Sequence, residues 1–481
     1  MKKIVFLIIT LVFNSQTIKA QTVVLDANGV TVKWTGTTVP SPYFVQANPR
    51  GPMEWFAIID NSTRVYVTGY AKNIPSAITY FTPLGSSTPI PFNNIVTTLV
   101  INMSNMFYGV NAFNQSISSW DVTNVNNMSG MFYGASAFNQ PIGLWNIGSV
   151  TNMVGMFSSA HTFNQPIGFW EMSNVTDTQS MFYGASAFNQ PIESWDVSNV
   201  INMRGMFSYT NTFNQPIESW DVSSVTFMDG MFNGASEFNQ PIGSWNVSSV
   251  TDMGVMFGEA TAFNRPIGSW DVSDVTDMQS MFYGASAFNQ PIGYWDVSNV
   301  TNMTGMFRYA ASFNQPNGSW DVSNVNYMDD MFYGVQLSTA NYDDTLIGWA
   351  TIGPNESPLK PNVTFSGGNS NYCNGETARN SIIQTYGWTI TDAGLNCSSL
   401  ETEIFDAISL KLYPNPVLGV LNVKVDSNLI NQPYNVLDGL GRIVLNGNLN
   451  DVDTTINVDQ LSKGIYYIKL SDNNASKFVK E

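Results

Sequence analysis

The sequence predicts a repeat solenoid followed by a small C-terminal β-sandwich domain, and three observations support this fold class. A 25-residue block recurs from Asn102 to Tyr333 without insertion or deletion. A fixed period of this length is typical of stacked units that bury their apolar residues against their neighbours. Each block carries one Trp, from Trp120 to Trp320. Near the C-terminus, stretches such as 421–425 alternate apolar and polar residues, which is typical of strands.

The first 95 residues predict an export signal and a cap. Met1-Lys2-Lys3 is followed by an apolar run and then a polar stretch, so residues 1–20 are expected to be a signal peptide. The exposed end of a solenoid must be covered. Residues 21–95, with β-leaning stretches at 23–25 and 64–67, are therefore expected to form an N-terminal cap.

One block shows how each solenoid coil is expected to fold within 96–350. Trp295 and Val297 are two residues apart and share one face of an extended strand at 292–297. Apolar residues in 300–310 follow at offsets of three, three, one and three, which favours two turns of helix. We therefore predict a short parallel strand and a short helical segment per coil, with the Trp, Met and Phe residues in the core.

Two polar features of the blocks carry further expectations. Asn-Gln pairs such as Asn289-Gln290 recur, and their side-chain amides are expected to hydrogen-bond along the stack. Thr178 stands where other blocks have Met and is expected to mark a loosened layer.

The region after the blocks predicts a second cap and a linker. Residues 342–350 are expected to be helical, and 351–397 to form a cap with strand, helix and strand at 363–365, 375–386 and 388–390. Cys373 and Cys397 are expected to form a disulfide, because the chain carries an export signal. Such a loop stabilises by roughly 3–4 kcal/mol. Residues 398–408 are expected to be a linker and 409–481 the sandwich domain.

Charge and hydropathy exclude some partners. Residues 96–350 contain 20 acidic and three basic residues, a net charge of −17 that equals the net charge of the whole chain. Such an acidic region repels phosphate backbones, so we expect no nucleic acid, and cations or partners with basic patches fit better. No apolar run after the signal peptide approaches the roughly 18 residues of a transmembrane helix.

The repeats resemble a known family. Units such as WDVSNVTNMTGMFRYAASFNQPNGSW, residues 295–320, are similar to the 25-residue repeats of the BspA-like, leucine-rich-repeat-related surface proteins, including mycoplasma lipoproteins. The resemblance covers roughly 93–350, with every landmark in phase. It implies a leucine-rich-repeat-like solenoid and a role in adhesion.

The C-terminus carries a second resemblance. Residues 412–416 (LYPNP), 440–442 (LGR) and 461–466 (LSKGIY) are similar to the type IX secretion sorting domain of Bacteroidetes. The resemblance covers about 409–481 and implies contact with the type IX secretion machinery, followed by release or surface attachment. The matched motif residues are Tyr413, Pro414, Asn415, Pro416, Gly441, Gly464 and Tyr466.

The residue after each Trp is acidic in seven of nine blocks, on the expected outward face. One interpretation is that these carboxylates accept hydrogen bonds from turn Ser or backbone groups. The other is weak Ca²⁺ binding between coils, since Ca²⁺ collects carboxylate and carbonyl oxygens. We expect no other cofactor and no catalytic residue, because no nucleophile-base set, phosphate loop or His/Cys cluster is present.

Departures from the repeat give the candidate contact residues. The residue before Trp is Ser in six blocks but Leu, Phe or Tyr in three, and Glu replaces Gly two positions before Trp in two blocks. With the acidic positions, the ligand-contact candidates are Leu144, Phe169, Tyr294, Glu193, Glu218, Asp196, Asp221, Asp271, Asp296 and Asp321. We predict a non-enzymatic secreted or cell-surface recognition or adhesion protein whose solenoid face binds an extracellular protein or glycan. The alternative is a structural spacer or envelope component without a specific ligand.

Overall fold

The computed structural model describes residues 22–72, 80–83, 87–353, 357–397, 411–425, 429–438, 442–470 and 474–481. The chain divides into two compact units, Met1–Asn396 and Cys397–Glu481, which are considered separately. The predicted signal peptide and the predicted linker lie outside the described residues.

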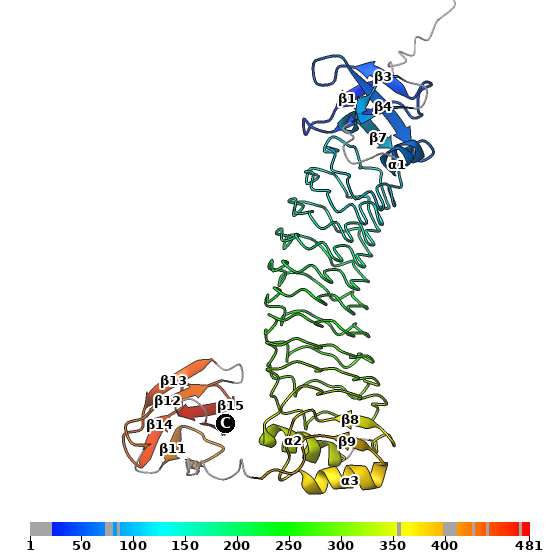
Figure 1. The fold of residues 1–481 in the computed structure, drawn as a ribbon. Helices are drawn as coiled ribbons and strands as arrows, with labels where there is room; N and C mark the ends of the chain where they lie inside the picture. The colour runs from blue at the N-terminus through cyan, green and yellow to red at the C-terminus, as the bar shows by residue number, and fades with distance from the viewer. Residues whose placement is uncertain are drawn as a thin grey trace, which may run out of the picture. The chain divides into compact units, whose positions relative to one another are not determined.

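The first unit begins with small sheets and one helix (Figure 1). Strands β1 (Val23–Leu25) and β2 (Val32–Trp34) pair antiparallel. A three-stranded sheet has the order β3 (Phe44–Ala47), β4 (Glu54–Asp60), β7 (Ile95–Leu99), with β4 and β7 parallel. The other elements are helix α1 (Arg64–Lys72), the paired strands β5 (Tyr80–Phe81) and β6 (Ile90–Pro91), and the 3-10 helix η1 (Phe92–Asn94).

The predicted strand at 23–25 is confirmed, whereas the one at 64–67 is wrong because it opens helix α1. Before the helix, the Asp60 carboxylate accepts the backbone N–H groups of Ser62 and Thr63, both at 2.9 Å. Val67 and Ala71 are the buried residues of the helix, and their spacing of four is helical. The helical face therefore prevails over the β propensity of the valines.

The 25-residue blocks follow one another as layers joined by backbone hydrogen bonds (Figure 1). One residue per block forms an isolated parallel bridge to the next block, in the series Asn102, Asn127, Asn152, Asp177, Asn202, Phe227, Asp252, Asp277, Asn302 and Tyr327. Further N–H groups of a block donate to the next one, as Phe207 N does to Met231 O at 2.9 Å. Neighbouring blocks are thus joined by one isolated bridge and by several further backbone hydrogen bonds.

The predicted leucine-rich-repeat-like solenoid, with a strand and a helical segment in each coil, is wrong. Between residues 102 and 338 the described chain contains turns and one-residue bridges, and the few helices and the small sheets lie outside this range. The predicted helix at 300–310 contains Gly305 and Tyr309 with φ of 60° and 61°. Two left-handed residues per block interrupt any right-handed helix.

The predicted strand at 292–297 is wrong for a related reason. Trp295 N donates to Ile292 O at 3.1 Å, which closes a tight turn where the strand was expected. The apolar residues still point inward, because the turn brings Ile292, Trp295 and Val297 into the core.

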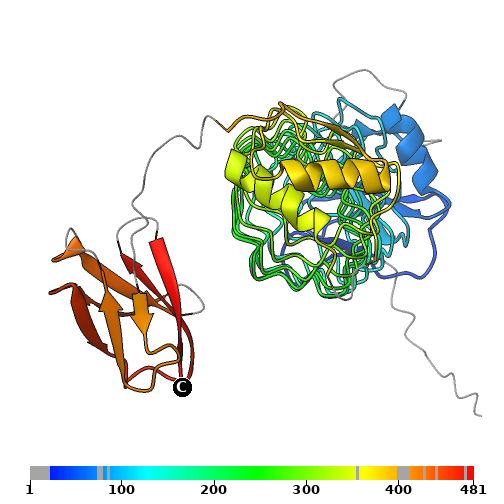
Figure 2. The same cartoon turned by 90° about the horizontal axis from the view of Figure 1, so that it is seen from below.

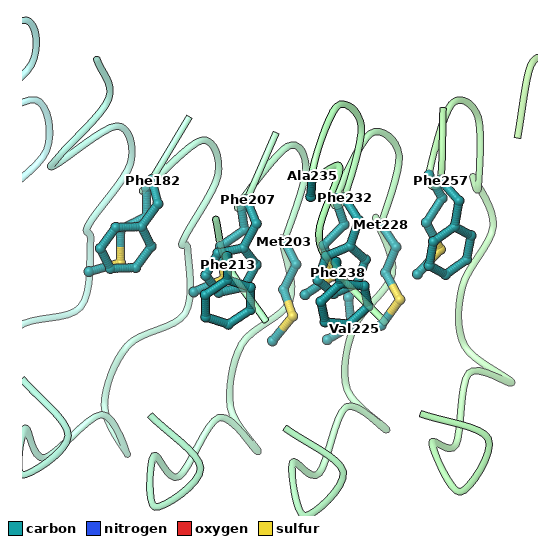
Figure 3. Packing of buried hydrophobic residues seen from close by; sticks show 14 of the residues in the cluster. Phe182, Met203, Phe207, Phe213, Val225, Met228, Phe232, Ala235, Phe238 and Phe257 are labelled. Carbon is teal, nitrogen blue, oxygen red and sulfur yellow. The ribbon is translucent and has the colours of Figure 1, made fainter. Parts of the chain in front are cut away.

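The predicted core is confirmed: the Trp of each block, its recurring Met residues and the two recurring Phe columns, such as Phe207 and Phe213, are buried. Figure 3 shows the Phe rings of successive blocks aligned beside Met203 and Met228. The rings of Phe207 and Phe232 are 5.8 Å apart and nearly parallel. Each Trp also satisfies its polar edge, as Trp195 Nε1–H does by donating to Ile167 O of the preceding block at 3.0 Å.

The predicted amide column is also confirmed. Asn164 Oδ1 accepts both the backbone N–H of Asn189, at 3.0 Å, and Gln190 Nε2, at 2.9 Å. The same pattern recurs in neighbouring blocks. Thr178 is fully buried and its hydroxyl donates to Asn202 O at 3.2 Å, so the position is hydrogen-bonded to the next block.

After the last block come helix α2 (Thr339–Ala350), strand β8 (Thr364–Ser366), helix α3 (Glu376–Tyr386) and strand β9 (Thr389–Thr391), with β8 and β9 parallel. These elements confirm the predicted helix, strand, helix and strand. Figure 2 shows α2 and α3 lying across the end of the blocks. Phe332 N donates to Ser366 O at 3.0 Å, which ties the last block to β8.

The C-terminal unit is strand-rich. One antiparallel sheet contains β10 (Lys411–Tyr413), β11 (Val420–Lys424) and β14 (Asp453–Asn457). The other, also antiparallel, has the order β13 (Ile443–Asn448), β12 (Pro433–Leu437), β15 (Gly464–Leu470), β16 (Asn474–Lys480). Residues of both sheets, including Leu421, Val436 and Ile468, form one core. The predicted strands near 421–425 and 465–469 are confirmed.

Candidate functional site

The position before Trp separates the blocks into two kinds. In the six Ser blocks the hydroxyl donates to a carbonyl about one block earlier, as Ser194 Oγ does to Gly168 O at 2.7 Å. The equivalent donors are Ser119, Ser219, Ser244, Ser269 and Ser319. In the other three blocks Leu144, Phe169 and Tyr294 are 62%, 94% and 92% exposed. These three side chains are exposed to solvent, whereas the Ser of the other blocks forms a hydrogen bond to the preceding block.

The acidic position after Trp forms local hydrogen bonds. The carboxylates of Asp196 and Asp221 each accept a Ser hydroxyl two residues on, at 2.6 Å. Asp271 repeats this bond at 2.7 Å, and Asp296 and Asp321 accept the backbone N–H two residues on. The Ser hydroxyls are the main cause that lowers the pKa of Asp221 and Asp271. The hydrogen-bond interpretation of this position is therefore confirmed.

Metal binding at these acids has no such geometric support. Within the part of the chain that the structure describes, no group of three or more His, Cys, Asp or Glu side chains is placed to hold a metal ion.

The predicted contact residues extend over eight successive blocks, from Leu144 to Asp321. Leu144 and Phe169 lie in adjacent blocks, as do Glu193 and Glu218, which are exposed. Asp321, which is half-buried, lines a small hollow of about 100 Å³ near the end of the blocks. The structure thus places these residues along an extended surface and does not gather them around one point.

The sequence reasoning missed a larger hollow, of about 460 Å³, that is lined by residues of several blocks between Gln179 and Gln279. It lies in a column of the block that is often Tyr, at Tyr108, Tyr133, Tyr183, Tyr283 and Tyr333. The same column reads Ser208, Asn233 and Gly258 in three successive blocks. This interruption is visible in the sequence and could have indicated the hollow.

An ion-pair network crosses the hollow. Arg204 Nε lies 2.5 Å from Asp229 Oδ1, and its Nη2 lies 3.4 Å from Asp252 Oδ2. The guanidinium also lies over the Phe227 ring, 4.3 Å from the centroid. Desolvation is the main cause that raises the pKa of Asp252, and the neighbouring carboxylates of Asp229 and Asp277 raise it further.

The two cysteines form the predicted disulfide, since Cys373 and Cys397 are both disulfide-bonded and are the two cysteines of the chain. The start of α3 is also tied to α2. Asp343 of α2 accepts the backbone N–H groups of Cys373, Asn374 and Gly375 at 2.8–2.9 Å.

The sorting-motif residues connect strands of the C-terminal unit. Tyr413 donates its hydroxyl to Asp453 on β14 at 2.5 Å, and Asn415 accepts Val479 N on β16 at 2.8 Å. Tyr466 is buried, and its hydroxyl donates to Ser462 O at 3.0 Å. Gly464 begins β15, whereas Gly441 lies outside the described residues. Pro414 and Pro416 flank Asn415 in the turn after β10.

The fold defines a class: a chain with a layered array of 25-residue blocks and a separate, strand-rich C-terminal unit. Residues 411–481 match the family described as secretion system C-terminal sorting domain. This match supports export by type IX secretion and a secreted or cell-surface location. No helix in the described ranges is long and apolar enough to span a bilayer.

The blocks match a second family model in three overlapping segments, 81–193, 181–285 and 256–351. Together these segments cover more than half of the chain. The chain therefore belongs to the family described as Mycoplasma protein of unknown function, DUF285. No curated protein and no solved structure matches the chain.

Proposed function

We propose that this exported chain is a non-enzymatic recognition protein that binds an extracellular protein or glycan through exposed side chains of the blocks. The observation that carries the proposal is the column before Trp. Phe169 and Tyr294 are more than nine-tenths exposed, and Leu144 lies one block before Phe169. Exposed aromatic side chains of this kind are enriched where proteins bind partners.

A structural role does not explain these three residues. The Ser of the other blocks donates a hydroxyl to a carbonyl of the preceding block, and a net hydrogen bond of this type contributes roughly 0.5–1.5 kcal/mol. Leu144, Phe169 and Tyr294 give up this bond and leave apolar area in water. Their presence therefore costs stability, which favours selection for contact with a partner.

The triple variant L144S/F169S/Y294S tests the proposal, because Ser is the common residue of the column. Purified full-length chain is added to immobilised extracellular matrix proteins and to host or bacterial cells, and saturable binding is measured. We expect the triple variant to bind at least about tenfold more weakly than the wild type. It should melt at the same temperature or slightly higher. Each new Ser hydroxyl can donate to the backbone carbonyl that is equivalent to the acceptor in the Ser blocks.

A matched control is S194A, which changes the same column without removing an exposed apolar group. It should bind as the wild type does. Equal binding by the wild type and the triple variant would contradict the proposal. Absence of saturable binding by the wild type, together with self-assembly in solution, would support the structural spacer instead.

A further inference from the structure

We infer that the hollow around Arg204 and Asn233 binds a neutral saccharide, one or two sugar rings of an extracellular glycan. The inference rests on the proposed recognition function, but it uses other positions of the block than the column before Trp. It begins from the shape of the surface. The hollow measures about 460 Å³, within the roughly 300–1,000 Å³ that is usual for small-molecule sites.

The hollow exists because small residues replace the usual large ones. Ser208 and Asn233 stand where Tyr183 and Tyr283 stand in flanking blocks. Gly205, Gly230 and Gly254 also line it. Tyr183, which is 40% exposed, remains at one end and offers an aromatic ring to the apolar face of a ligand.

The charges of the hollow repel anionic ligands, and the cationic side chain of Arg204 already occupies two of its carboxylates. The blocks carry a net charge of −17 between residues 96 and 350, which repels anionic ligands. A cationic ligand would have to compete with the guanidinium of Arg204 for the carboxylates of Asp229 and Asp252. A neutral ligand avoids both the repulsion and the competition with Arg204.

The hydrogen-bonding groups that remain suit hydroxyl groups, each of which both donates and accepts. Within the described ranges, no protein partner is found for the side-chain amide of Asn233 or for Nε2 of Gln179 and Gln279. Both Gln Oε1 atoms accept from an Asn side chain of the next block, which orients the two amides. The hollow therefore presents oriented amide donors beside carboxylate acceptors, as polyhydroxylated rings require.

The charged side chains that line the hollow are already held in position by other protein groups. Arg204 is held by two carboxylates and by the ring of Phe227 at 4.3 Å. Asp277 is held as well, since it accepts Gln279 N at 2.7 Å and Asn302 Nδ2 at 3.1 Å. Because these side chains need little ordering on binding, the entropic cost of association is reduced.

The decisive variant is N233Y, which restores the Tyr of the column. The chain contains a precedent. Tyr333 stands to Tyr309 as position 233 stands to Tyr209, and the rings of Tyr333 and Tyr309 make edge contact at 5.5 Å. The new ring is therefore expected to fit beside Tyr209 and to fill the hollow. Full-length wild type and N233Y are applied to a printed array of neutral gluco-, galacto- and manno-oligosaccharides beside sialylated ones. We expect the wild type to bind at least one neutral series and N233Y to bind it at least about tenfold more weakly.

Three further measurements sharpen the result. R204Q, which introduces the Gln of two other blocks at this position, should also weaken binding. The wild-type dissociation constant should change little between about 0.05 and about 0.5 M NaCl, because a neutral ligand is not screened. The L144S/F169S/Y294S variant should retain binding to the array.

The inference is overturned by absence of any neutral signal, by equal binding of wild type and N233Y, or by binding that is confined to acidic glycans or collapses in salt. The two proposals fail separately. A silent array with cell binding that depends on Leu144, Phe169 and Tyr294 removes the saccharide site and leaves the proposed function. If N233Y abolishes binding to the array while the triple variant binds cells as the wild type does, the saccharide site stands. The proposed role of the column before Trp is then removed.

Discussion

The blocks and the C-terminal unit bury their cores by different means. In the C-terminal unit, paired strands place alternate residues inward, as in β14, where Thr454 and Ile456 are buried between exposed neighbours. In the blocks, tight turns point apolar residues inward, and layers are joined by single bridges and by aromatic and amide columns. An apolar spacing can therefore specify a core without specifying helix or strand.

Loss of one ring from the buried Phe column should give the largest effect. Phe207 is fully buried, with Phe182 and Phe232 on either side at 5.7 and 5.8 Å and Phe213 at 4.1 Å. We expect Phe207→Ala to destabilise the first unit by about 3–5 kcal/mol, because it removes apolar contacts and leaves a cavity. Thermal and denaturant unfolding would measure this loss.

The exposed aromatic Tyr294 supplies the control for Phe207. Tyr294→Ser should leave the free energy of unfolding of the first unit unchanged or raise it by up to about 1 kcal/mol, because Ser can form the hydrogen bond of this column. The C-terminal unit has its own core, so its transition should not move in Phe207→Ala. A joint shift of both transitions would contradict the separation of the two units.

Left-handed residues distinguish the blocks from regular elements. Gly230 has a φ of 62°, and an added Cβ would meet nothing closer than 3.9 Å. Gly230→Ala should therefore cost about 1–2 kcal/mol through backbone strain alone. Gly69 lies within helix α1, and an added Cβ would meet nothing within 4 Å. Gly69→Ala should stabilise by about 1 kcal/mol. Equal signs for the two changes, in denaturant unfolding, would contradict the turn-based structure of the blocks.

The smallest expected effect is the pH dependence of stability that comes from Asp252, one of the residues that form the bridges between blocks. Burial and neighbouring carboxylates raise the pKa of Asp252, so its ionisation disfavours the folded state. The stability that this group contributes is present at acid pH and is lost as pH rises through its folded pKa. Asp252→Asn keeps the side-chain oxygen that accepts Gly254 N, as Asn202 does for Arg204 N. We expect a rise in melting temperature on the order of 1 °C at pH 7 that disappears near pH 3. A loss at neutral pH would show that the Arg204 ion pair outweighs desolvation.

The sequence predicted secondary structure correctly where the apolar periodicity fits only one kind of element. The alternation at 421–425 and the helical pattern at 342–350 both correspond to observed elements, β11 and α2. The core of the blocks followed from which residues are apolar. The backbone of the blocks did not, because offsets of three, three, one and three suit a helix and also suit turns with a left-handed residue. Tyr309 gives no sign of φ 61° in its residue type.

The candidate site was predictable in part for a similar reason. The exposure of Phe169 and Tyr294 followed from departures from Ser in one column. The hollow at Asn233 depends on three columns at once, namely a missing Tyr, the glycines of the turns, and the path of Arg204 across Phe227 to the next block but one. The missing Tyr was visible in the sequence, whereas the other two contributions required the layered geometry.

The central claim is that the regular blocks are a scaffold and that recognition depends on the residues that depart from them. The most direct test is the variant L144S/F169S/N233Y/Y294S, in which four departures are replaced by the common residue of their column. Its binding to cells and to the glycan array is compared with that of the wild type, with thermal unfolding as a check on the fold. We expect a melting temperature unchanged to within a few degrees and loss of both kinds of binding. Full retention of binding by this variant would contradict the central claim.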